Sequence, residues 1–183
     1  MTLYHGSPIG NIKELVPSLS EHGKPYIYFA KNPVVALLYA VRPVEKPFSW
    51  YPYGFDGDTV IYSEYYEGAF ADIYKDKIGF LYECDNVPNT ENPTNINCAY
   101  TCEKAVTVDR VSRIDDIYKH FMNHQSHGNF CIKEYKDIGP EEIAMVTENL
   151  KNLILNNNLI ADKDSQISRF ISEKFPQIWK EFI

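Results

Sequence analysis

The pattern that decides the fold lies at residues 25–41, which read PYIYFAKNPVVALLYAV. Its first part alternates apolar with tyrosine-bearing positions, namely Ile27 and Phe29 against Tyr26, Tyr28 and Ala30. Because successive side chains of a strand point to opposite faces, this alternation predicts a strand over residues 25–30. One face of that strand is expected to pack in a core, and the tyrosine face to line a cleft.

The second part of the same stretch predicts a helix. Asn32 can cap its N-terminus, and Pro33 suits its first turn. Four apolar residues recur at helical spacing and are expected to form its buried face: Val34, Leu37, Leu38 and Val41. Tyr39 lies off this face and can therefore face the same cleft as Tyr28. Arg42-Pro43 is expected to end the helix.

Outward from this stretch, strands dominate the first two thirds of the chain and helices the last third. Further strands are expected at residues 2–6, 59–63, 78–84, 104–111 and 129–135. Helices are expected at residues 9–15, 64–76 and 114–122, after Gly139-Pro140, and from about Asp164. Residues 43–58, with Trp50 and Tyr53, predict a long aromatic loop that either covers a site or packs on the surface. This order favours an α+β fold in a single domain of residues 1–183.

The charge and composition exclude several classes of function. A formal net charge of -7 opposes broad attraction to nucleic-acid phosphates or anionic lipid. The chain has neither an apolar run long enough to span a bilayer nor a signal-peptide pattern, so we expect a cytoplasmic protein without a membrane partner. Neither GxGxxG nor GxxxxGK[ST] occurs, so a Rossmann or P-loop turn is not expected.

Cysteine and histidine do not form a recognisable metal or disulfide pattern. The four cysteines, Cys84, Cys98, Cys102 and Cys131, contain no CxxC pair and are interpreted as free thiols. His120, His124 and His127 are interpreted as helix-surface histidines, because Gly128 is expected to end their helix before Cys131. No metal site is predicted.

The tripeptide His5-Gly6-Ser7 ends the first predicted strand and carries groups suited to a polar ligand. Glycine lets a ligand approach the backbone, whose N–H and C=O can pair with a planar amide. The histidine and serine side chains add directional hydrogen bonds. Taken alone, a histidine that leaves a strand is equally compatible with a structural role. The two tyrosines, Tyr28 and Tyr39, favour the ligand role because two rings can enclose a flat heteroaromatic group.

These motifs resemble the ADP-ribosyltransferase superfamily, in its His-Tyr-Glu branch of diphtheria-like toxins and poly(ADP-ribose) polymerases. The resemblance rests on Tyr4-His5-Gly6-Ser7, on Tyr28-Phe29-Ala30 and on Tyr39, and it covers about residues 3–111. It implies a split, mostly antiparallel sheet with flanking helices, and NAD as co-substrate. It also implies an NAD-binding core at residues 1–137 and a C-terminal helical extension at residues 138–183.

The resemblance also implies roles for single residues. His5 would bond a ribose hydroxyl, Gly6 would hold the nicotinamide carboxamide through its backbone, and Ser7 would bond the same carboxamide. Tyr28 and Tyr39 would stack on the two sides of the nicotinamide ring. Lys31 stands where polymerase-like relatives commonly have an acid, and the Gln/Glu-x-Glu motif of the arginine-modifying branch is missing.

A catalytic glutamate is expected at or just before a later strand, and Glu103 in Thr101-Cys102-Glu103-Lys104 matches that position. A fixed carboxylate can stabilise the oxocarbenium-like state through which the ribose–nicotinamide bond breaks. Other carboxylates stay open as alternatives, namely Glu83, Glu64 and Glu67.

The sequence therefore predicts an enzyme that cleaves the nicotinamide–ribose bond of NAD and transfers ADP-ribose to an unidentified protein, nucleic-acid or small-molecule acceptor. A catalytically silent module that binds NAD or ADP-ribose is the alternative. RNA 2′-phosphotransferase activity ranks lower, because an acidic chain lacks the basic surface that RNA binding requires.

Overall fold

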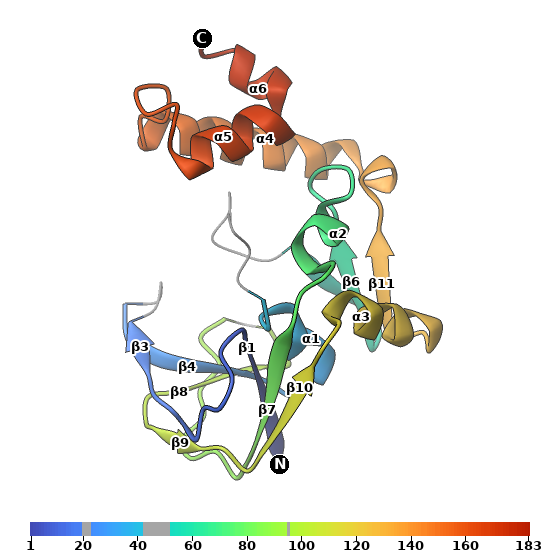
Figure 1. The fold of residues 1–183 in the computed structure, drawn as a ribbon, viewed down its shortest axis with the longest axis vertical. Coiled ribbons are helices and arrows are strands. Elements are labelled where there is room, and N and C mark those ends of the chain that lie inside the picture. Colours follow the sequence, from blue (N-terminus) through green and yellow to red (C-terminus); the bar gives the residue numbers. More distant parts are fainter. Residues whose placement is uncertain (20–22, 42–51, 95) are drawn as a thin grey trace. The chain divides into compact units, whose positions relative to one another are not determined.

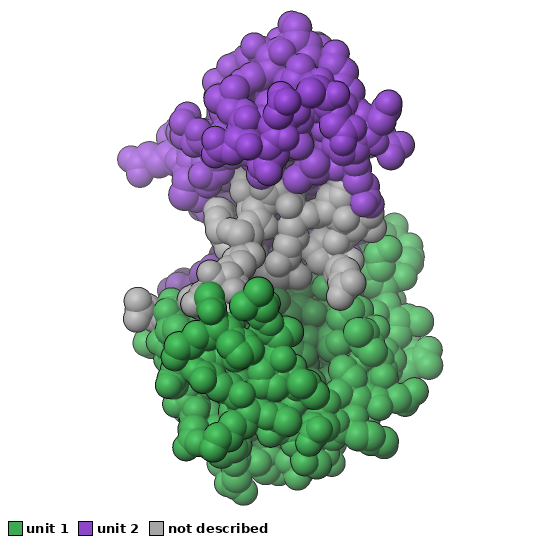
Figure 2. Space-filling model, turned by 90° about the vertical axis from the view of Figure 1, so that its left-hand side faces the viewer, with its two compact units in different colours: residues 1–42, 74–127 green, residues 43–73, 128–183 purple. Residues whose placement is uncertain are grey.

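The computed structural model describes residues 1–19, 23–41, 52–94 and 96–183, and it confirms the α+β class. The chain divides into two compact units, coloured separately in Figure 2. Unit 1 comprises residues 1–42 and 74–127, and unit 2 comprises residues 43–73 and 128–183. Each unit draws on two separate segments, so its boundaries differ from the predicted division at residue 137. The single domain stays a prediction.

Unit 1 is built on a six-stranded antiparallel sheet whose central strand is β1 (Thr2–Ser7). On one side β1 pairs with β7 (Gly79–Asp85), and β7 pairs with β10 (Arg110–Ile114). On the other side β1 meets β4 (Pro25–Ala30), which also pairs with β8 (Ala99–Cys102). The strands predicted at residues 2–6, 25–30 and 78–84 are confirmed.

Smaller elements complete unit 1 (Figure 1). They are the strand β3 (Ser18–Leu19) on β4, the two-stranded ladder of β2 (Glu14–Leu15) with β9 (Val106–Thr107), and the helices α1 (Pro33–Leu38) and α3 (Ile117–Ser126). The single strand predicted at residues 104–111 is therefore wrong, because the chain forms β9 and then β10 there.

The helix α1 follows the prediction closely. The Asn32 side chain caps it by accepting a hydrogen bond from the Val34 N–H at 2.9 Å, and Pro33 opens its first turn. All four predicted apolar residues are buried, and so are Val35, Ala36 and Ala40. Tyr39 is 40% exposed, as expected for a residue off the buried face. The predicted helix end at Arg42-Pro43 lies outside the described residues.

The helix predicted at residues 9–15 is wrong, and a residue distant in sequence explains why. The phenol of Tyr82 donates a hydrogen bond to the Ile9 carbonyl at 2.7 Å and accepts one from the Ile12 N–H at 3.3 Å. Asn11 adopts a φ of 62°, which is incompatible with a right-handed helix. The segment thus stays irregular until Leu15 pairs with Val106.

Unit 2 combines a three-stranded sheet with the C-terminal helices. Strand β6 (Thr59–Ser63) pairs antiparallel with β5 (Tyr53–Asp56) and parallel with β11 (Phe130–Lys133). The helical part comprises α2 (Ala69–Tyr74), a 3-10 turn at Tyr135–Asp137, α4 (Pro140–Asn156), α5 (Gln166–Lys174) and α6 (Pro176–Lys180). Within the aromatic loop predicted at 43–58, residues 53–56 form β5 instead, and Trp50 lies outside the described residues.

One face of the unit 1 sheet covers a hydrophobic core. Its buried members come from β1, β2, β4, β7, β8 and β9: Leu3, Leu15, Ile27, Phe29, Cys84, Cys102 and Val106. Ile27 and Phe29 are therefore on the core face, as their alternation predicts. The opposite face of β1 lies against α1.

Gly6 is the point at which β1 and α1 come closest. A Cβ atom added to Gly6 would lie 1.9 Å from the Ala36 carbonyl oxygen and 2.9 Å from the Ala40 nitrogen. Both contacts are backbone atoms, so no side-chain rotation can relieve them. The sequence suggested a glycine for ligand access, and the structure adds that the packing of α1 also requires it.

We expect the substitution Gly6→Ala to destabilise the protein by roughly 2 kcal/mol or more, because it overpacks a fixed backbone contact. Gly54→Ala is the control, since a Cβ there meets nothing within 4 Å. Chemical denaturation of both variants measures the difference. Equal unfolding free energies for the two variants would contradict the close packing of β1 on α1.

Candidate functional site

The candidate site lies where β1 and β4 part. In the described chain the two strands share a single register pair, Tyr4 with Ala30, whereas β1 and β7 are paired along their whole length. In Figure 1, β4 runs at a steep angle to β1 and β7. The two strands thus diverge from Ala30 toward Pro25. This divergence gives the sheet a split at the position of the His5-Gly6-Ser7 motif.

His5 bridges the two strands with its side chain. Its Nδ1 lies 2.8 Å from the Tyr28 carbonyl oxygen. A carbonyl can only accept, so Nδ1 carries the hydrogen and donates it. The His5 ring also packs against the rings of Phe29 and Tyr82, with centroids 6.1 and 6.4 Å away.

The surroundings of His5 favour its neutral form. Burial lowers its pKa from the usual 6.5, and the hydrogen bond to the Tyr28 carbonyl opposes this only in part. With the hydrogen on Nδ1, the neutral ring presents Nε2 as an acceptor. An acceptor at this point suits a hydroxyl donor such as that of a ribose.

The backbone of Gly6 faces the split. The Tyr28 carbonyl points toward β1, since it accepts from His5. Backbone groups two residues apart in a strand point to the same edge, so those of Ala30 also face β1 and pair with Tyr4. The N–H and C=O of Gly6, two residues beyond Tyr4, are therefore directed toward β4, past the end of the ladder.

Ser7 is buried, and its Oγ accepts a hydrogen bond from the Ile9 N–H at 3.1 Å. A hydroxyl that accepts retains one O–H to donate. Ser7 is thus partly engaged in holding the chain after β1.

Tyr28 and Tyr39 belong to the same side of the sheet. The close contact of Gly6 with Ala36 identifies the face of β1 that carries Tyr4 and Gly6 as the α1 face. Ala30 is opposite Tyr4, so Ala30 and Tyr28 share that face. Tyr39 is the C-cap of α1 itself. The two rings are 37% and 40% exposed, which leaves surface for a ligand.

Glu103 is brought to the same face by the pairing of β8 with β4. The register sets Tyr28 opposite Thr101 and Ile27 opposite Cys102. By alternation, Glu103 follows level with Tyr26, on the Tyr28 face. Its carboxylate is half exposed and forms an ion pair with the Lys24 ammonium at 3.0 Å.

The alternative carboxylates occupy different surroundings. Glu83, in β7, is held by Arg110 at 2.9 Å. Glu64 is buried in unit 2, where it accepts hydrogen bonds from the backbone N–H groups of Phe70, Tyr135 and Gly68 at 3.0, 3.3 and 3.4 Å. Glu67 also belongs to unit 2 and is exposed. These contacts account for Glu83 and Glu64 as structural groups.

Sequence reasoning missed Glu91. Its backbone exchanges two hydrogen bonds with Thr101, so it stands beside β8, and its carboxylate lies 3.4 Å from the Tyr26 phenol. Nothing in the sequence distinguished Glu91 within the polar segment of residues 85–97. Only the pairing across ten residues brings it to the face of Tyr26 and Tyr28.

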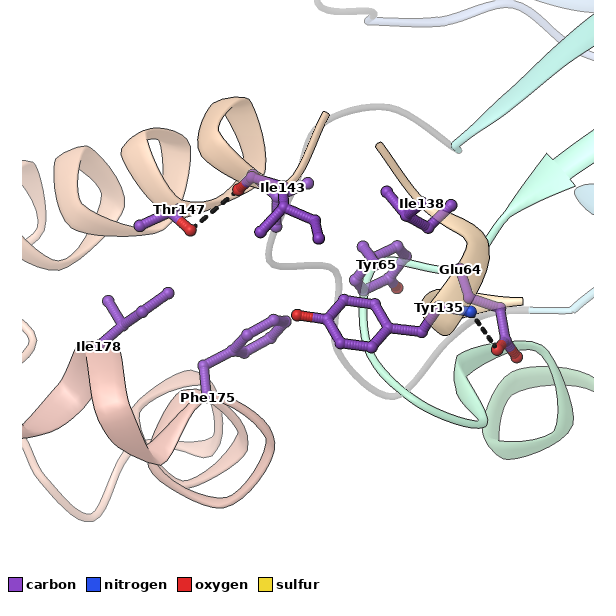
Figure 3. A pocket seen from close by; sticks show the side chains of 9 residues that line it. Glu64, Tyr65, Tyr135, Ile138, Ile143, Thr147, Phe175 and Ile178 are labelled. Atoms are coloured by element: carbon purple, nitrogen blue, oxygen red, sulfur yellow. Dashed lines mark hydrogen bonds between the residues drawn. The ribbon is translucent and has the colours of Figure 1, made fainter. Parts of the chain in front are cut away.

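A separate cavity of about 290 Å³, its open mouth included, lies within unit 2 (Figure 3). Its walls are mainly apolar and aromatic, with Phe175, Ile138, Ile143 and Ile178 among them. The Tyr135 phenol points toward Phe175, and the Glu64 carboxylate is turned to the Tyr135 backbone. None of the six predicted site residues lines this cavity.

Comparison with protein-family models, curated proteins and solved structures yields no match to this chain. Across the described residues, no three His, Cys, Asp or Glu side chains cluster so as to hold a metal ion. In the same part of the chain, no helix is long and apolar enough to cross a membrane.

The lowered pKa of His5 predicts a pH-dependent contribution to stability. Because the folded chain binds the proton less readily than the unfolded chain, the contribution is present above about pH 6.5 and is lost as the pH falls toward the folded pKa. We expect His5→Asn, whose amide can still donate to Tyr28, to lack this loss. Chemical denaturation between pH 7.5 and 5.5 measures it, and parallel curves for both proteins would contradict a neutral buried His5.

Proposed function

We propose that this protein is an NAD-dependent ADP-ribosyltransferase. The observation that supports it most is the split between β1 and β4, with the Gly6 backbone directed into it, His5 bridging it and Tyr28 on its α1 side. A nicotinamide group has the matching chemistry, since it combines a planar carboxamide with a flat ring.

The residues at the split divide the binding task among them. The N–H and C=O of Gly6 pair with the carboxamide, and the Ser7 hydroxyl donates to its oxygen. Tyr28 and Tyr39 stack against the ring, which adds apolar contact area. His5, neutral and protonated on Nδ1, accepts from a ribose hydroxyl through Nε2. This donor and acceptor set fits the nicotinamide–ribose half of NAD.

Glu103 supplies the negative charge for the chemical step. NAD contributes an activated glycosidic bond, which breaks with the electron pair leaving on nicotinamide while the acceptor nucleophile bonds to the ribose carbon. The Glu103 carboxylate stabilises the positive charge that develops on the ribose. Its location on the Tyr28 face agrees with this role.

One observation favours a second candidate, a silent module that binds NAD or ADP-ribose. Glu103 is paired with Lys24, and an ammonium 3.0 Å away offsets the field of the carboxylate. Calorimetry that detects nucleotide binding without nicotinamide release in any acceptor mixture would support this alternative.

We expect the native chain to release nicotinamide from NAD and Glu103→Gln to release it about a hundredfold more slowly, since an amide cannot supply the stabilising charge. Glu83→Gln is the matched control, because Glu83 lies in β7 and is engaged by Arg110. Chromatographic assay of nicotinamide measures the rates. Equal rates for the native chain and Glu103→Gln would remove Glu103 from the mechanism.

Replacing either exposed tyrosine should weaken nicotinamide binding without unfolding the chain. We expect Tyr28→Leu and Tyr39→Leu each to raise the dissociation constant of nicotinamide roughly tenfold through lost ring stacking, and Phe at either position to restore it. Titration calorimetry measures the affinity, with thermal unfolding as the check on folding. Unchanged affinity in both Leu variants would contradict a tyrosine sandwich.

A further inference from the structure

Lys24 is the cation nearest to the proposed catalytic carboxylate and is joined to two parts of the site. Its ammonium pairs with Glu103 at 3.0 Å and lies 6.0 Å from the centre of the Tyr26 ring. Tyr26 in turn meets the ring of Tyr28 edge to face, with centroids 6.2 Å apart. Lys24 is therefore linked to both Glu103 and the proposed nicotinamide-stacking ring.

The pair between Lys24 and Glu103 is accessible to solvent and able to exchange partners. The two side chains are 57% and 45% exposed. Exposed ion pairs contribute only about 0–1 kcal/mol, so a stronger anion can displace the carboxylate at little cost. The hydrogen bond to Glu103 raises the pKa of Lys24, which keeps the ammonium charged at neutral pH.

Lys24 also stands at the open end of the split. The strands meet at Ala30 and diverge toward Pro25, and Lys24 directly precedes β4. At the rise of an extended strand, Lys24 is about 13 Å along the chain from Tyr28. A dinucleotide whose nicotinamide binds at Gly6 and Tyr28 has its ribose and diphosphate beyond the ring, in the direction of this open end.

We propose that Lys24 is a positioning residue that exchanges its partner when an anionic dinucleotide binds. In the free protein it pairs with Glu103, and in the complex it pairs with the diphosphate and so releases the carboxylate toward the ribose. This inference rests on the proposed function, and it assigns the diphosphate a part in unmasking Glu103. The two anions compete for one ammonium, so Glu103 and the diphosphate affect Lys24 in opposite ways.

The competition gives two substitutions opposite effects on ADP-ribose binding, which titration calorimetry measures directly without turnover. Lys24→Met is expected to weaken ADP-ribose binding roughly tenfold through loss of a charge-assisted contact. Glu103→Gln is expected to tighten it a few-fold, since the ammonium is no longer engaged. In the double variant Lys24→Met with Glu103→Gln, the second substitution should add nothing.

Two controls separate this competition from a general change in charge. Lys104→Met removes the same charge one residue from Glu103 and should leave ADP-ribose binding nearly unchanged. Nicotinamide, which has no phosphate, should bind the native chain and Lys24→Met equally. Raising the ionic strength should reduce the difference between these two proteins for ADP-ribose.

The outcomes are distinct. If native protein binds neither nicotinamide nor ADP-ribose, the proposed function fails and this inference with it. If the native chain binds both but Lys24→Met binds ADP-ribose as well as native does, the exchange alone is overturned. It is equally overturned if Glu103→Gln weakens ADP-ribose binding, or if Lys104→Met weakens it as much as Lys24→Met.

Discussion

The hydrogen bond from His5 Nδ1 to the Tyr28 carbonyl is the interaction on which the geometry of the candidate site depends. It lies just beyond the pair of Tyr4 with Ala30, where β1 and β4 begin to diverge. A side chain thus occupies the acceptor that a backbone N–H would take in a continuous ladder. Because the acceptor is satisfied in this way, the sheet can open at this point without leaving that carbonyl unpaired.

The same bond links the fold to the chemistry of the ligand. It determines which nitrogen of His5 carries the hydrogen, and burial keeps the ring neutral. On the other side of β1, the contact of Gly6 with the Ala36 carbonyl holds α1 close to the sheet and fixes where its C-cap, Tyr39, begins. The tyrosines, the glycine edge and the histidine are therefore positioned by two short contacts of adjacent residues.

Glu64 illustrates why a carboxylate cannot be assigned a role from its sequence neighbourhood. Its two oxygens accept from three backbone N–H groups, near the start of α2 and at Tyr135, so a buried charge is compensated by the chain itself. These contacts also limit the helix predicted at residues 64–76 to Ala69–Tyr74. Glu103, in contrast, is exposed and paired with a lysine that can move away.

By itself the sequence determined the features that depend on near neighbours: the alternation of residues 25–30, the Asn32 cap with Pro33, and the buried face of α1. These follow from local backbone geometry and from burial of apolar side chains. Only the tertiary structure decided that residues 9–12 are held by Tyr82, and that Thr101 and Glu91 stand beside Tyr28. Such contacts join segments separated by long loops, and they depend on strand register and side-chain hydrogen bonds that no local pattern encodes.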